Sequence, residues 1–122
     1  MISAILLAAG RSKRIKGQNK LSKKFKGIPL INHILKSLIK SKVNRIIIVL
    51  GYENKKIKKI SLKSKKITFA VNSNYLKGIS TSVKCGLKKI SKKNIGFLIV
   101  QADMPLVSKR TINVLCSAIK NR

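Results

Sequence analysis

Residues 5–21 read ILLAAGRSKRIKGQNKL: an apolar run, then three small residues, then a segment dense in cations. The apolar run begins at Ile2 and predicts a buried strand that ends at Ala8. Gly10 allows the chain to turn sharply after this strand. Small residues, accessible backbone N–H groups and cations at the carboxyl end of a strand are what a triphosphate group requires. The stretch therefore predicts an α/β fold with a phosphate-binding loop after the first strand.

Two common phosphate-binding motifs do not match this loop. The P-loop needs a lysine directly after its second glycine, whereas Gly17 is followed by Gln18. The dinucleotide fingerprint G-x-G-x-x-G is absent as well. The alternative interpretation is a strand followed by a solvated basic loop, and in a lysine-rich chain the cations alone favour it. The small-residue turn, with Arg14 and Lys20 at their spacings, favours a ligand site.

The composition predicts one domain over residues 1–122 with a formal net charge of +27. Such a charge is typical of proteins that bind nucleic acid or anionic surfaces. The 29 basic residues are spread over every segment, so we interpret them as a compositional drift and expect only nonspecific binding of nucleic acid. Acidic residues number 2, so any carboxylate that binds a metal ion or acts as a base must be Glu53 or Asp103.

Histidine and cysteine usage excludes other kinds of site. A single histidine cannot form a histidine cluster, and Cys85 and Cys116 have no C-x-x-C spacing. We expect both cysteines to act as small apolar residues in a reducing cytoplasm. No apolar run approaches the length of a membrane span, and the cations follow the first apolar run, unlike those of a signal peptide. The sequence thus predicts a cytoplasmic protein without a membrane partner.

The rest of the chain alternates between strand and helix patterns. The run at 45–50 is apolar without alternation and β-branched, as expected of a central parallel strand. Strands alternating with helices imply a parallel sheet with right-handed crossovers, and we expect three α/β/α layers. We expect strands over 2–8, 45–50, 67–71 and 97–101, and helices over 30–40, 54–62, 79–90 and from Ser108.

Asp103 follows the last predicted strand, at the carboxyl end where α/β sheets bind ligands. Mg²⁺ prefers one or two carboxylates together with phosphates and water. The alternative is a helix cap, but Pro105 and the predicted helix start at Ser108 leave a short loop between. We therefore interpret Asp103 as a ligand of Mg²⁺.

A second polar segment, residues 72–86, places hydroxyl and N–H groups from Gly78 to Ser82 at a predicted helix start. Such a terminus suits an anion or the polar edge of a base. An ordinary helix cap is the alternative interpretation.

Three of these segments together resemble one family, the molybdenum cofactor cytidylyltransferase-like (MobA-like) nucleoside-triphosphate transferases. Residues 7–21 resemble the family loop L-A-A-G-x-S-x-R-M-G-x-x-K, with Ile15 and Lys16 in place of its usual Met and first Gly. Residues 72–83 resemble N-x-x-x-x-x-G-[IL]-S-T-S-[LV], and residues 102–107, ADMPLV, resemble G-D-M-P-L-V. Three motifs in this order are far more specific than any one of them.

The resemblance implies a Rossmann-like fold of the nucleotide-diphospho-sugar transferase type. It implies Mg²⁺-dependent transfer of CMP from CTP to the molybdenum–pterin cofactor, with release of pyrophosphate. CTP is expected because residues 8–10, AAG, resemble the cytidylyl branch, whereas guanylyl relatives more often carry A-G-G. The implied catalytic residues are Arg14, Lys20 and Asp103, of which Asp103 holds the metal. The implied nucleotide-binding residues are Leu7, Ala8, Ala9, Gly10, Arg11, Ser12, Arg14, Lys20, Asn72, Gly78, Ser80 and Ser82.

Members of the resembled family are longer, so we expect a C-terminally truncated domain that binds nucleotide but turns over poorly. Two alternatives stay open. In the first, the chain is a nucleotidyltransferase whose acceptor is a sugar phosphate or another small phosphate. In the second, it is a basic nucleic-acid-binding protein. An aromatic content of 4% weakens any surface for stacking bases.

Overall fold

A computed structural model describes residues 1–10 and 20–121, and its centre is a four-stranded parallel sheet. The strands lie in the order β5-β4-β1-β6, and every neighbouring pair is parallel, as predicted. They are β1 (Ile2–Ala8), β4 (Arg45–Leu50), β5 (Ile67–Val71) and β6 (Gly96–Gln101).

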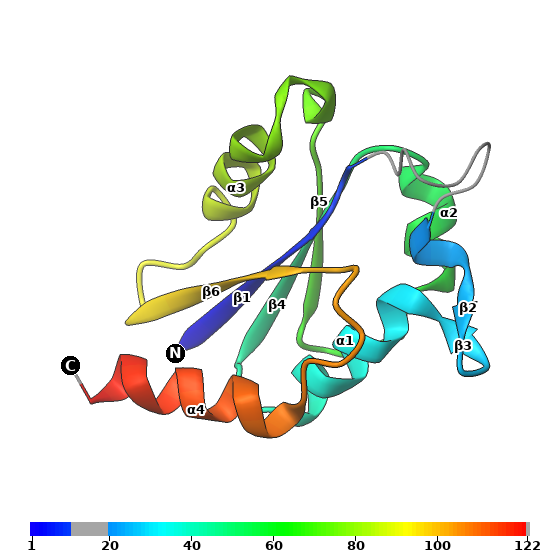
Figure 1. Cartoon of the computed structure of the whole chain (residues 1–122). Coiled ribbons are helices and arrows are strands. Elements are labelled where there is room, and N and C mark those ends of the chain that lie inside the picture. The colour runs from blue at the N-terminus through cyan, green and yellow to red at the C-terminus, as the bar shows by residue number, and fades with distance from the viewer. Residues whose placement is uncertain (11–19, 122) are drawn as a thin grey trace.

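Helices cover both faces of the sheet and form three layers, which confirms the predicted architecture. Helix α3 lies on one face, and α1 and α4 lie on the other (Figure 1). Helix α2 shares the α1 side, because its buried Ile57 belongs to the same core as α1. The helices are α1 (Leu30–Lys40), α2 (Asn54–Ile60), α3 (Ile79–Leu87) and α4 (Lys109–Lys120). Shorter elements are the 3-10 turns η1 (Lys20–Ser22) and η2 (Tyr75–Lys77) and the hairpin of β2 (Lys24–Phe25) and β3 (Ile28–Pro29).

Both central strands are buried on both faces, which is why they are continuously apolar. Alternate residues face opposite layers: Leu6 and Ile48 pack toward α1, whereas Ile5 and Ile47 pack on the α3 side. The core on the α1 side is the larger of the two. Helix α1 contributes to this core an apolar stripe at helical spacing, which runs from Ile31 to Leu38.

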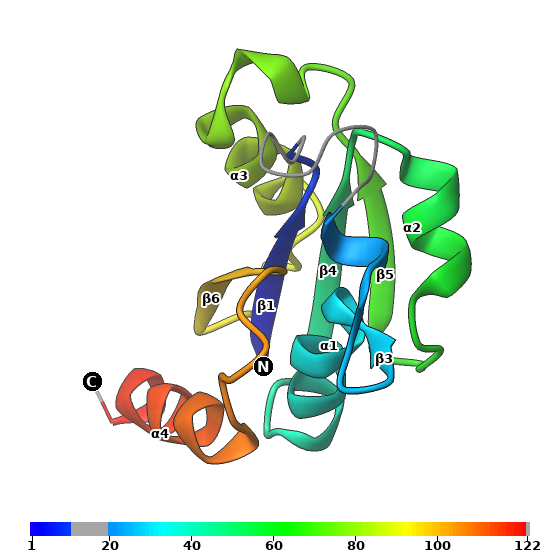
Figure 2. The same ribbon diagram turned by 45° about the vertical axis from the view of Figure 1, so that its right-hand side comes forward.

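Helix α2 ends at Ile60, two residues before the predicted end, because Asn32 of α1 binds the chain at this point. The Asn32 amide donates to the Ile60 carbonyl at 2.9 Å, and its oxygen accepts from the Leu62 N–H at 3.1 Å. A buried side chain from another helix therefore decides where α2 stops. Figure 2 shows α1 and α2 on the same side of the sheet.

The end of another helix differs slightly from prediction. Helix α3 ends at Leu87, because Ile90 closes a tighter turn by donating to the Leu87 carbonyl. Helix α1 begins at Leu30, as predicted, and Pro29 directly before it pairs with Lys24 across the hairpin.

Candidate functional site

The carboxyl ends of the four parallel strands lie at one edge of the sheet, where α/β proteins bind ligands. Predicted site residues that follow different strands lie at this edge for that reason: Ala9 and Gly10 follow β1, Asn72 follows β5, and Asp103 follows β6. Gly51, which the sequence did not predict as a site residue, follows β4 at the same edge.

The end of β1 is held by both neighbouring strands. The Tyr52 N–H donates to the Ala9 carbonyl at 3.0 Å, and the Ala102 N–H donates to the Leu7 carbonyl at 3.1 Å. Ala9 is buried, whereas Gly10 is exposed, and a Cβ built on Gly10 would meet no atom of the described residues within 4 Å. Within residues 1–10 and 20–121, no side chain therefore crowds the position at Gly10 where the sequence predicts a ligand.

Lys20 and Asp103 lie together at this edge, although they are far apart in the sequence. The Lys20 Nζ lies 3.9 Å from Asp103 Oδ2. Leu21 anchors η1 by packing into the core on the α1 side, and this places Lys20 beside the end of β6. The two side chains are 34% and 45% exposed, and an exposed pair of this kind stabilises a fold only weakly. Both charges therefore remain available to a ligand.

The donor set at Asp103 suits a cation that is shared with a ligand. Among residues 1–10 and 20–121, no group of three His, Cys, Asp or Glu side chains could enclose a metal ion. Mg²⁺ characteristically takes one or two protein carboxylates and completes its shell with phosphates and water. A single exposed carboxylate at the ligand-binding edge fits this requirement.

Asn72 and Ser82 bind each other and hold the segment after β5 against α3. The Asn72 amide donates to the Ser82 and Thr81 hydroxyls, both at 2.9 Å, and its oxygen accepts from the Asn74 N–H at 2.9 Å. Asn72 is 6% exposed and Ser82 is 4% exposed. Asn72 and Ser82 were predicted to contact the nucleotide. In the structure their side chains hydrogen-bond each other, and they position this segment against α3.

The start of α3 is the more open part of the same segment. Gly78 precedes the helix with a φ of 116°, a conformation that side-chain-bearing residues rarely adopt. No side chain of the described residues caps α3, and Gly78 and Ser80 are both exposed. The start of α3 is thus exposed at the edge that carries Lys20 and Asp103, and helix starts of this kind suit anions or the polar edge of a base.

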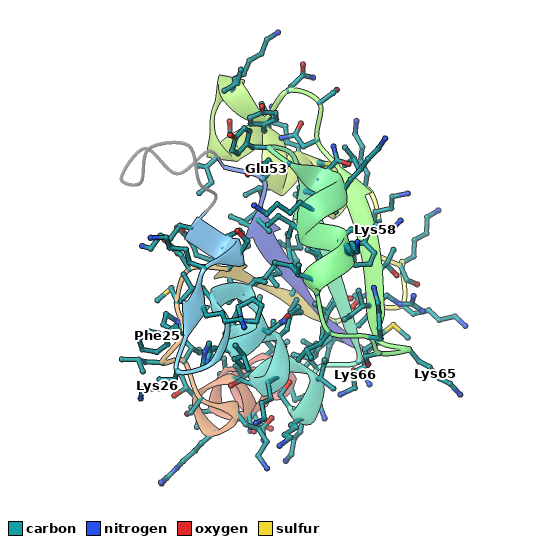
Figure 3. All side chains as sticks on the ribbon, turned by 90° about the vertical axis from the view of Figure 1, so that its right-hand side faces the viewer. Phe25, Lys26, Glu53, Lys58, Lys65 and Lys66 are labelled. Atoms are coloured by element: carbon teal, nitrogen blue, oxygen red, sulfur yellow. The ribbon has the colours of Figure 1, made fainter. Side chains whose placement is uncertain are left out.

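Glu53, the other acidic residue of the chain, also lies at this edge. It directly precedes α2, with a left-handed φ of 54°. Its Oε2 lies 3.8 Å from the Lys56 Nζ, and its Oε1 is buried without a hydrogen-bond partner among the described residues. Figure 3 shows Glu53 at the start of α2, away from Lys65 and Lys66.

Arg11, Ser12 and Arg14 lie outside the described residues, so their predicted roles stay predictions. Among the helices that the structure describes, none combines the length and apolar character that a membrane crossing requires.

Comparisons with known proteins agree with this architecture. A family model for the MobA-like NTP transferase domain matches residues 4–122. The bifunctional protein GlmU of Clostridium tetani is 32% identical over 115 residues, which are 92% of this chain and 24% of that protein. The chain therefore spans about a quarter of the length of this curated relative.

Solved structures share the fold. A nucleotidyl transferase from Methanothermobacter thermautotroptrophicus superposes with a TM-score of 0.83 at 23% identity, over 96% of this chain and 57% of that one. Rv0371c from Mycobacterium tuberculosis in complex with manganese superposes with a TM-score of 0.76 at 17% identity, over 96% of this chain and 58% of that one. These similarities confirm the predicted fold type.

Proposed function

The chain belongs to the MobA-like NTP transferase domain family, and on that premise we propose that it is a nucleotidyltransferase domain. It binds a nucleoside triphosphate at the carboxyl edge of its sheet. It transfers the nucleotidyl group to a phosphorylated acceptor and releases pyrophosphate. Residues 1–122 form one domain in this proposal.

The observation that carries the proposal is the proximity of Lys20 and Asp103, at 3.9 Å. Nucleotidyl transfer concentrates negative charge on the α-phosphate and on the leaving pyrophosphate. A cation from η1 and a carboxylate from the loop after β6 approach the same point, and neither is buried in the core. When a triphosphate binds with a divalent cation, Lys20 would pair with the negative phosphates and Asp103 would bind the cation, in place of the ion pair between them.

The remaining groups of the edge fit the rest of the nucleotide. The open backbone at Gly10 suits close approach of the nucleotide, and the accessible start of α3 at Gly78 and Ser80 suits the base and ribose. CTP is the proposed nucleotide, because residues 8–10 have the AAG form of the cytidylyl branch. Asn72 supports this surface by holding the turn before α3 in place.

The reaction is an in-line displacement. An oxygen of the acceptor's phosphate attacks the α-phosphorus of CTP, the bond from that phosphorus to the β-phosphate oxygen breaks, and pyrophosphate leaves. Mg²⁺, when bound, neutralises charge on the phosphates. Lys20 adds a positive charge beside the triphosphate, and Asp103 orients the cation. Catalysis then consists chiefly of positioning and charge neutralisation.

The proposed acceptor is the molybdenum–pterin cofactor, on the strength of the three family motifs. A sugar phosphate is the competing acceptor within the same reaction class. The proposed compartment is the cytoplasm, where Cys85 and Cys116, both free thiols, would stay reduced.

The proposal is tested by calorimetric titration of the chain with CTP, GTP and ATP, with and without Mg²⁺. Asp103→Asn and Lys20→Ala are measured beside Lys23→Ala, a matched variant of an exposed lysine next to η1. We expect Mg²⁺-dependent binding that favours CTP, is lost in the first two variants and is kept in the third. Equal binding of all three nucleotides without Mg²⁺, unchanged by any substitution, would show that the basic surface merely attracts polyphosphate. Transfer assays with each acceptor then decide the substrate.

A further inference from the structure

A single hydroxyl group, that of Thr81, holds together the turn between β5 and α3. Thr81 Oγ1 accepts a hydrogen bond from the Asn72 amide at 2.9 Å. The same oxygen lies 2.7 Å from the Gly78 carbonyl oxygen and 3.0 Å from the Asn74 carbonyl oxygen, and its one proton is donated to either of them. The hydroxyl thus connects the start, the middle and the end of the turn, which leads from β5 to α3 in Figures 1 and 2.

Asn72 links this hydroxyl to the central sheet. Its backbone N–H donates to the Leu50 carbonyl at the end of β4, at 2.7 Å. Its buried side chain donates one N–H to Thr81 and the other to Ser82, both at 2.9 Å. The position of the Thr81 hydroxyl is therefore set by the sheet and by the body of α3, because hydrogen bonds connect it to both.

The Gly78 carbonyl is the group whose direction this arrangement fixes. It accepts from the Thr81 backbone N–H at 3.2 Å and faces the Thr81 hydroxyl at 2.7 Å. The peptide bond is planar and trans, so the carbonyl and the N–H of one peptide point in opposite directions. A Gly78 carbonyl directed into α3 therefore turns the Ile79 N–H away from the helix. Glycine has little conformational preference of its own, and Gly78 adopts a φ of 116°, so the restraint must come from its neighbours.

Three consecutive hydroxyl side chains at the start of α3 lie in different surroundings. Ser82 is 4% exposed and binds Asn72, and Thr81 is half-buried within the turn. Ser80 is exposed. Thr81 was not among the predicted nucleotide-binding residues, and its hydrogen bonds show that it serves the turn itself.

We propose that Thr81 is a positioning residue for nucleotide binding. Its hydroxyl holds the peptide after Gly78 and the Ser80 side chain in the arrangement that receives the nucleoside part of CTP, without contacting the nucleotide. The inference rests on the proposed function, which assigns the base and ribose to Gly78 and Ser80 and the triphosphate to Lys20 and Asp103. Loss of the Thr81 hydroxyl should therefore weaken the nucleoside contacts and spare the triphosphate contacts.

Two substitutions at Thr81 separate the hydroxyl from the rest of the side chain. Thr81→Val removes the hydroxyl and keeps the branched shape. This variant should fold, because the Gly78 carbonyl keeps its bond from the backbone N–H of residue 81 and Asn72 keeps its bond to Ser82. Thr81→Ser retains the hydroxyl and should behave like the unaltered chain.

Ser41→Ala is the matched control, because Ser41 also holds a turn together through its hydroxyl. That hydroxyl donates to the Leu38 carbonyl at 2.7 Å and accepts from the Val43 N–H at 3.2 Å. Ser41 is buried and lies before β4, at the edge of the sheet opposite to the proposed nucleotide site. Its loss should lower stability and leave ligand binding unchanged.

The test measures the Kd of CTP and of inorganic tripolyphosphate by calorimetry, each with Mg²⁺, for the full chain and the three variants. We expect Thr81→Val to weaken CTP binding by roughly fivefold to tenfold, as the loss of one hydrogen bond does, and to change tripolyphosphate binding by less than about twofold. Thr81→Ser and Ser41→Ala should bind both ligands like the unaltered chain. Urea unfolding of each variant establishes that folded proteins are compared. A purely structural role would not separate the two ligands.

Three results would overturn the inference while leaving the proposed function in place. They are unchanged CTP binding by folded Thr81→Val, an equal loss of CTP and tripolyphosphate binding in that variant, and a similar loss of CTP binding in Thr81→Ser. A different result would overturn the proposed function and the inference together. An unaltered chain that binds CTP no more tightly than tripolyphosphate has no nucleoside contact for Thr81 to position.

Discussion

Gly51→Ala should destabilise the protein strongly, because Gly51 lies against two segments at the carboxyl edge of the sheet, the end of β1 and η2. A Cβ at this position would lie 2.8 Å from the Ala9 carbonyl oxygen and 2.8 Å from both Cβ and Cδ1 of Tyr75. The Ala9 carbonyl cannot retreat freely, since it accepts a hydrogen bond from the Tyr52 N–H. The added methyl group must therefore separate the end of β1 from η2.

The expected loss follows from the nature of the contacts. Overpacking a well-packed site costs roughly 1–3 kcal/mol, and a clash with a held backbone carbonyl belongs at the upper end. For a chain of 122 residues, 1 kcal/mol corresponds to about 4 °C in Tm. We expect Gly51→Ala to lower Tm by about 12 °C, and to weaken CTP binding even where the protein is folded.

Thermal unfolding followed by circular dichroism measures this effect, with urea unfolding as an independent check. Gly10→Ala is the matched control, because a Cβ there meets nothing within 4 Å in the part of the chain that the structure describes, and the stability should change by less than about 0.5 kcal/mol. A Gly51→Ala variant that melts within about 2 °C of the natural protein would refute the reasoning, since that corresponds to about 0.5 kcal/mol.

Three further predictions concern Asn72, Lys66 and the two cysteines. Asn72→Ala should lower the free energy of unfolding by about 2–3 kcal/mol, because it removes the partner of the buried Ser82 hydroxyl and of the Asn74 N–H; a urea midpoint that does not move would contradict this. Lys66→Met should cost about 1 kcal/mol, because its Nζ donates to two carbonyls at the end of α1, while Lys65→Met, at an exposed neighbour, should cost nothing in the same titration. Cys85 should react with a thiol reagent at pH 8 well before Cys116, because burial raises the pKa of the Cys116 thiol and lowers its thiolate fraction, and equal labelling rates would argue against the buried position.

The sheet could be predicted closely because its strands carry their own local pattern. The bounds of β1, β4 and β5 coincide with the predicted ranges, since continuous β-branched and apolar runs bounded by polar segments have few other conformations available. The end of α2 could not be predicted in this way. Its lysine-rich sequence would allow two more helical residues, but Asn32, from a helix far back in the chain, binds the backbone there.

The candidate site, too, could be predicted only in part. Motif spacing placed Lys20 and Asp103 at strand ends, and the parallel sheet brings those ends to one edge. Spacing could not show that Asn72 would be engaged with hydroxyl groups of α3, nor that Glu53 would adopt a left-handed conformation before α2. Those outcomes depend on which side chains meet after the helices pack.

By itself, the sequence determined the alternation of strands and helices, the parallel sheet and the polar segments at the strand ends. Each of these depends on residues close together in the chain, whose periodicity and turn chemistry act locally. Only the tertiary structure decided that Lys20 reaches Asp103 and that Asn72 supports the start of α3. These features depend on contacts between distant segments, and the free energy of such a contact is set by the packed surroundings of both partners.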